Sequence, residues 1–109
     1  MAYSKSLAAR IRQAIGRRRG LTEKKMFGGV CFLLGGNMLV GVWQESLVVR
    51  LGPEQGESAL NEEYVRPFDI TGRPMKGWVM VEPDGLDTDR QLTTWLERAI
   101  DFVATLPPK

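Results

Sequence analysis

The chain has 109 residues, of which 43% are hydrophobic, and a net charge of +2, which predicts one globular domain with a core of its own. It contains no histidine and one cysteine, so imidazole catalysis, histidine zinc sites and internal disulfides are excluded. Residues 1–25 hold eight Lys or Arg and one Glu, a net charge of +7, which leaves −5 for residues 26–109.

The first expected element is a helix from Ser4 to about Arg18. Its apolar residues follow the i, i+3, i+4, i+7 spacing of one helical face. Ser4 or Ser6 would cap the N-terminus, and Gly20 would end the helix after a basic last turn. The apolar face consists of Leu7, Ala8, Ile11, Ala14 and Ile15.

Three short apolar segments then predict an antiparallel meander. Its strands are expected from Lys25 to Leu34, from Met38 to Trp43 and from Leu47 to Leu51, with turns at residues 35–37 and 44–46. The pair Gly28-Gly29 inside the first strand is unusual for a plain strand. It predicts a bulge there, or a close approach of another backbone or a ligand.

The second half predicts a helix, two strands and a last helix. The helix is expected from Pro53 to about Asn61, and the strands from Val65 to Ile70 and from Gly77 to Glu82. Residues 83–85 predict a turn. Residues 88–91 match a capping box, and the apolar stripe of the helix that follows consists of Leu92, Trp95, Leu96, Ala99, Phe102, Val103 and Leu106.

The order helix, three-strand meander, helix, two strands, helix predicts an α+β fold with helices packed on one face of the sheet. No linker or repeat divides residues 1–109, so we expect a single domain. The other sheet face would be left to a partner. Trp43 and Trp78 are the candidate interface aromatics on it.

Several short motifs together resemble the N-terminal domain of the TfoX/Sxy family, bacterial proteins associated with the regulation of natural competence. The most specific are Met26-Phe27-Gly28-Gly29 and Gly72-Arg73-Pro74-Met75, the latter followed by Gly77-Trp78-Val79. Leu47 to Arg50, Phe68 and the segment from Leu92 to Ala99 also fit, so the resemblance spans nearly the whole chain.

The resemblance implies the same α+β element order, similar to secretion-chaperone-like folds, and offers no catalytic residues to carry over. Full-length competence regulators of the family have a second, helical C-terminal domain. Because this chain ends at Lys109, just after the last expected helix, we expect a stand-alone form of the N-terminal domain.

Two groups of basic residues are candidate contact sites. The first would contact nucleic-acid phosphates, or would be a solvated helix end that complements the helix dipole; it comprises Arg17, Arg18, Arg19, Lys24 and Lys25. The second consists of Arg73 and Lys76, in a polar connection where they would hold a carboxylate or phosphate of a partner, or would be ordinary loop residues.

We therefore expect a non-enzymatic protein-interaction domain, a regulator or adaptor that associates with itself or with another protein. The alternative is a nucleic-acid-associated accessory protein that uses the basic N-terminal segment. Cys31 lies in an apolar strand, where burial makes a thiol inert. No cofactor, metal site or membrane segment is expected, and the lone cysteine and the interrupted N-terminal apolar run favour the cytoplasm.

Overall fold

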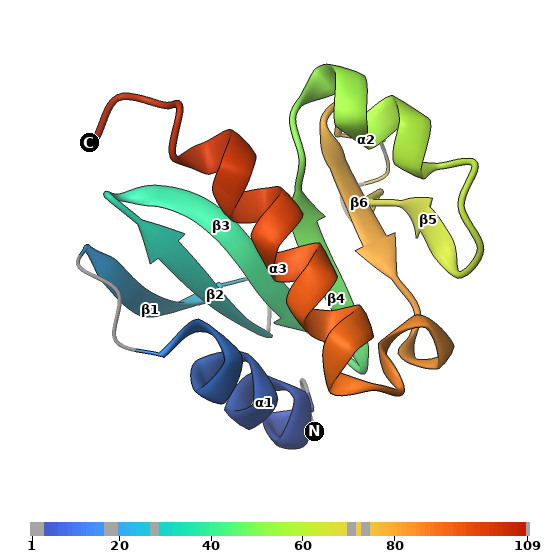
Figure 1. Cartoon of the computed structure of the whole chain (residues 1–109), viewed down its shortest axis with the longest axis horizontal. Coiled ribbons are helices and arrows are strands. Elements are labelled where there is room, and N and C mark those ends of the chain that lie inside the picture. Colours follow the sequence, from blue (N-terminus) through green and yellow to red (C-terminus); the bar gives the residue numbers. More distant parts are fainter. Residues whose placement is uncertain (1–3, 17–19, 27–28, 70–71, 73–74, 109) are drawn as a thin grey trace.

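The computed structural model describes residues 4–16, 20–26, 29–69, 72 and 75–108. Within them the chain forms three α-helices, one short 3-10 helix and six strands (Figure 1). In chain order these are α1 (Lys5–Ile15), β1 (Leu21–Met26), β2 (Gly29–Leu34), β3 (Asn37–Trp43), β4 (Ser46–Arg50), α2 (Pro53–Ala59), β5 (Val65–Pro67), β6 (Trp78–Val81), η1 (Pro83–Leu86) and α3 (Asp89–Val103).

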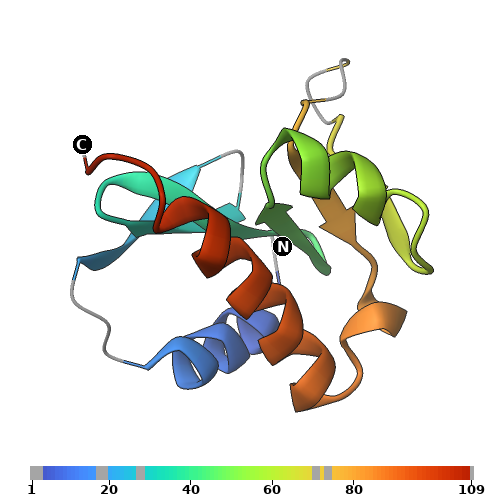
Figure 2. The same ribbon diagram turned by 45° about the horizontal axis from the view of Figure 1, so that its top comes forward.

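The strands of the described residues form one antiparallel sheet in the order β1-β2-β3-β4-β6-β5. Helices α1 and α3 lie on the same side of this sheet, and α2 lies beside β6 (Figures 1 and 2). The α+β class and the helices on one sheet face are therefore confirmed, as is the family-like arrangement of helices and strands.

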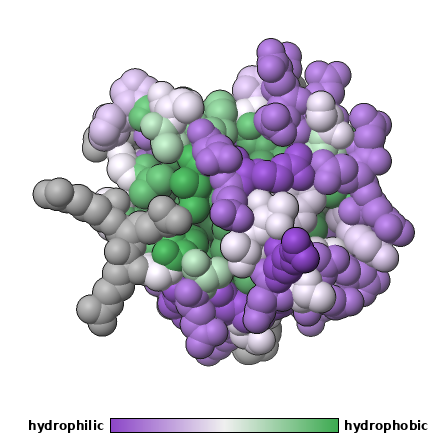
Figure 3. Space-filling view, in the orientation of Figure 1, coloured by the Kyte–Doolittle hydropathy of each residue, from purple (hydrophilic) through white to green (hydrophobic). Residues whose placement is uncertain are grey.

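The main core lies between the sheet and the two long helices. Alternate residues of the strands face the helices, because successive strand side chains point to opposite faces. Leu7 and Ile11 of α1 and Leu92, Leu96 and Ala99 of α3 meet the sheet residues Phe32, Val40, Val42, Leu47, Val49, Val79 and Val81. Figure 3 shows this side of the molecule, where hydrophobic surface gathers between α1 and the end of α3.

Both long helices begin at the caps that the sequence predicts. The Leu7 N–H donates to Ser4 Oγ at 3.1 Å at the start of α1. At the start of α3, the Gln91 N–H donates to Thr88 Oγ1 at 3.1 Å, and the Thr88 N–H donates to Gln91 Oε1 at 2.9 Å. This is a complete capping box, which satisfies two backbone N–H groups at the start of α3.

The prediction of the first strand of the meander was wrong. The sequence predicts one strand from Lys25 to Leu34, whereas the structure has two, β1 and β2, paired antiparallel with Lys24 opposite Cys31. Residues 22–25 of β1 are exposed, polar and at the sheet edge, so they carry little of the apolar pattern by which strands are recognised. The sheet therefore has one strand more than the sequence predicts.

Other boundaries differ by smaller amounts. Strand β5 has three residues and ends at Pro67, residues 83–86 form a 3-10 helix, and α1 ends at Ile15, with residues 17 and 18 outside the described part. Within that part, no helix is both long and apolar enough to cross a membrane.

Gly29 confirms one of the two expectations for the glycine pair, whereas Gly28 lies outside the described residues. A Cβ added to Gly29 would lie 1.9 Å from the Val42 carbonyl oxygen of the neighbouring strand, so another backbone does come close. The irregularity in the β2–β3 pairing falls elsewhere, between Phe32 and Leu33.

We predict that Gly29→Ala lowers the free energy of unfolding by about 3 kcal/mol, because the methyl group must displace backbone. Gly41→Ala is the matched control in β3. Its Cβ would lie 3.2 Å from the Val30 carbonyl oxygen, so a small shift relieves the contact and the expected loss is about 1 kcal/mol. Urea unfolding of both variants checks this, and equal losses would contradict it.

Candidate functional site

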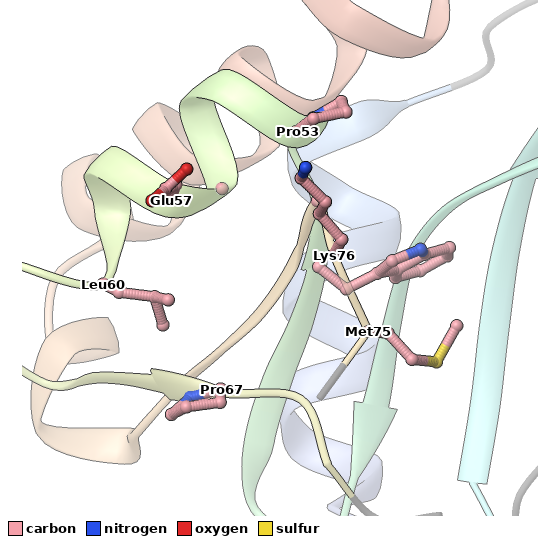
Figure 4. Close-up of a pocket in the computed structure, with 9 residues that line it drawn as sticks. Pro53, Glu57, Leu60, Pro67, Met75 and Lys76 are labelled. Carbon is pink, nitrogen blue, oxygen red and sulfur yellow. The ribbon is translucent and has the colours of Figure 1, made fainter. Parts of the chain in front are cut away.

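A groove lies between α2, the end of β5 and residues 75–78, which lead into β6 (Figure 4). Its volume is about 340 Å³, which is within the usual range of protein pockets. The lining residues are Pro53, Gly56, Glu57, Leu60, Pro67, Met75, Lys76, Gly77 and Trp78. The groove thus brings Lys76 and Trp78 together with α2. The sequence singles out these two residues separately and connects neither of them to this helix.

Gly77 holds α2 in place beside the groove. Its carbonyl oxygen accepts hydrogen bonds from the Leu51 N–H at 2.8 Å and from the Gly52 N–H at 3.1 Å, just before α2 begins. Gly56 within α2 packs directly on Gly77, because a Cβ at Gly56 would lie 2.8 Å from the Gly77 Cα. Gly77 itself has φ +89°, a conformation that favours glycine. The two glycines therefore set the distance between the walls of the groove.

The walls of the groove expose apolar side chains. Leu60 is 41% exposed and Met75 is 37% exposed, and they are two of the three large hydrophobic residues exposed in the described part of the chain. The third, Tyr64, lines a separate hollow. Exposed apolar residues gathered in a concave site are typical of binding surfaces rather than of ordinary surface.

Two exposed charged residues, Lys76 and Glu57, accompany these apolar walls. Figure 4 shows Lys76 next to Pro53, and Glu57 further along α2, between Pro53 and Leu60. Neither Lys76 nor Glu57 forms an ion pair within the described residues. The groove therefore combines apolar walls with one exposed charge of each sign.

Trp43 and Trp78 are half-buried, in contrast to the exposed positions expected for them. On the sheet face away from α1 and α3, both pack against a small second cluster made of Val48, Phe68 and Met80. The Phe68 and Trp78 ring centroids are 6.0 Å apart. This face is therefore partly covered by the chain's own side chains, and Trp78 contributes to the groove from its margin.

The basic residues that the sequence groups together are placed differently. Arg17, Arg18, Arg19 and Arg73 lie outside the described residues. Lys24 and Lys25 are exposed on the edge strand β1, and as successive strand residues they point to opposite faces of the sheet. Lys76 lies in the groove, so it is on a different surface from the lysines of β1.

A second, more polar hollow lies at the start of α3, and two of its charged groups are paired with each other. Arg98 makes a two-pronged ion pair with Glu62, at 3.0 and 3.1 Å, and stacks 4.4 Å from the Trp95 ring centroid. The nearby Glu63 raises the pKa of the exposed Tyr64 phenol. Within the described residues, no group of three or more Cys, Asp or Glu side chains is arranged to hold a metal ion.

Sequence reasoning missed Gly56, Gly77 and Leu60 as parts of a site. Gly56 did offer a signal, because glycine inside a seven-residue helix weakens that helix and calls for a packing reason. The partner that explains it, Gly77, lies 21 positions further along the chain, and nothing in the sequence links the two.

We predict that Gly56→Ala destabilises the fold by about 1–3 kcal/mol, although alanine normally favours a helix over glycine. The added methyl group would press on the Gly77 backbone and push α2 away from residues 75–78. Ser58→Ala, at an exposed position of the same helix, is the control and should stay within about 0.5 kcal/mol of the parent. Urea unfolding measures both, and a gain in stability for Gly56→Ala would overturn this account of the groove.

Cys31 is buried, and burial raises the pKa of its thiol to about 11. We predict that iodoacetamide modifies it at pH 8 slowly in the folded protein and rapidly in urea, since the thiolate is the reactive form. The folded state favours the neutral thiol, so the free energy of unfolding should fall as the pH rises from about 9 to about 11. Equal rates of iodoacetamide modification in the folded and the urea-unfolded protein would contradict the first of these two predictions.

Comparison with known families gives one match that covers most of the chain. The model of the TfoX N-terminal domain matches residues 13–103. No curated protein and no solved structure gives a significant match. The matched residues include the whole segment from Pro53 to Trp78, and therefore every lining residue of the groove.

Proposed function

This chain belongs to the TfoX N-terminal domain family, and we propose on that basis that it is a non-enzymatic interaction domain, a regulator or adaptor that binds a protein partner through the groove beside α2. The link to competence regulation comes with the family and is part of the proposal, as is a cytoplasmic location.

The observation that carries the proposal is the exposure of Leu60 and Met75 in one concave site. Protein interfaces are stabilised mainly by a few apolar or aromatic side chains that fill pockets, surrounded by polar groups that exclude water. The groove has this composition, because Pro67 and Trp78 line it together with the exposed pair, and Lys76 and Glu57 are its two charged residues.

A binding role, rather than catalysis, is supported by the chemistry of the side chains. The chain has no histidine, and its one thiol is buried with a raised pKa, so the usual nucleophile and base pairs are missing. The groove itself contributes one lysine and one carboxylate among apolar walls.

Nucleic-acid contact through the basic N-terminal segment stays a prediction. Its three arginines lie outside the described residues, and Lys24 and Lys25 point to opposite faces of β1. These two lysines do not form one phosphate-binding patch by themselves, so we give the groove precedence.

We predict that a photo-reactive benzoyl-phenylalanine placed at position 60 in the full chain cross-links a discrete protein partner in cells. The same group at position 13, exposed on α1 away from the groove, is the matched control. Met75→Asp should remove most of the product from position 60, because a carboxylate would then lie among the apolar walls. Cross-linking that is equal at positions 60 and 13, or absent at position 60, would refute the proposal.

A further inference from the structure

We infer that the partner in the groove is a second copy of this chain, related to the first by a two-fold axis. This inference rests on the proposed function, because it names the partner of the same groove. It adds a specific pairing: Lys76 of each copy faces Glu57 of the other, and Leu60 and Met75 of both copies are buried in the same interface.

The charges of the groove are complementary to themselves. In a two-fold interface, a contact from residue i to residue j of the other copy always occurs twice. One Lys76 and one Glu57 per copy, both exposed and without an ion pair in the described residues, therefore give two intermolecular ion pairs. A partner of a single charge sign would satisfy one of these groups and face the other with like charge.

The apolar residues of the groove fit the same partner. Leu60 and Met75 are residues with large, flexible side chains, and they are 41% and 37% exposed to solvent. In a two-fold pair, each copy supplies both the side chains to be buried and a hollow of about 340 Å³ to receive them. All of these exposed groups lose their contact with water in one association step.

Backbone contacts also join the walls of the groove, and a site that is formed before binding lowers the entropic cost of association. Its walls are fixed by the two hydrogen bonds to the Gly77 carbonyl oxygen and by the direct contact of Gly56 with Gly77. In the polar hollow near α3, by contrast, Arg98 and Glu62 are paired with each other within one copy.

Charge reversal tests the pairing with the full chain alone. Sedimentation velocity and size-exclusion chromatography with light scattering should show a dimer for the parent. Lys76→Glu places two carboxylates against each other at both pairs, and Glu57→Lys does the same with two ammonium groups. Each should raise the dissociation constant at least about tenfold. The double variant K76E/E57K restores opposite charges and should return to within about threefold of the parent.

Mixing the two single variants is the sharpest form of the experiment. Each forms like-charge contacts with itself, but the K76E chain paired with the E57K chain makes attractive contacts at both sites, so the mixture should dimerise. Both positions are exposed, so circular dichroism should show unchanged folds. Lys24→Glu on the distant edge strand β1 is the matched control and should dimerise like the parent.

A parent that stays monomeric at the highest attainable concentration would overturn the inference. So would a dimer that K76E and E57K leave intact, or a mixture of these variants that does not associate. If position 60 still cross-links a different protein in any of these cases, the proposed function stands and only the identity of the partner is wrong.

Discussion

The carbonyl oxygen of Gly77 joins two parts of the molecule that the chain keeps apart. It accepts hydrogen bonds from the N–H groups of Leu51 and Gly52, at the junction between β4 and α2. Gly56, one turn into α2, then packs against the Gly77 backbone. The helix is short and has few apolar residues of its own, so this backbone contact is one of the few interactions that position it. The groove exists only where the contact brings α2 against residues 75–78.

Much of the fold could be predicted from the sequence, because its strongest elements carry their own signals. The Thr88 capping box and the long apolar stripe after it located α3, and alternating or continuous apolar runs located β3, β4 and β6. Strand β1 could not be found in this way. It lies at the sheet edge with four successive exposed polar residues, and its place is determined by pairing with β2. Pairing is a tertiary property that residue patterns do not encode locally.

The candidate site could be predicted only in fragments. The sequence singled out Lys76 in a polar connection and Trp78 on the sheet face left to a partner, where Trp43 was also expected. The structure instead covers part of this face with a small cluster around Val48 and brings Lys76 and Trp78 to the groove. Their common location depends on contacts with Gly56 and Leu60, roughly twenty residues earlier. A single sequence contains no information on such distant contacts.

The two edges of the sheet bear on what kind of assembly the chain can enter. At one edge, β1 presents Lys24 and Lys25, and charged side chains at an edge discourage pairing with further strands. At the other edge, β5 has three residues and ends at Pro67, which has no N–H to donate. Both edges therefore oppose the strand-by-strand addition that produces open ribbons and fibres. A two-fold contact through side chains on another surface instead closes at two copies.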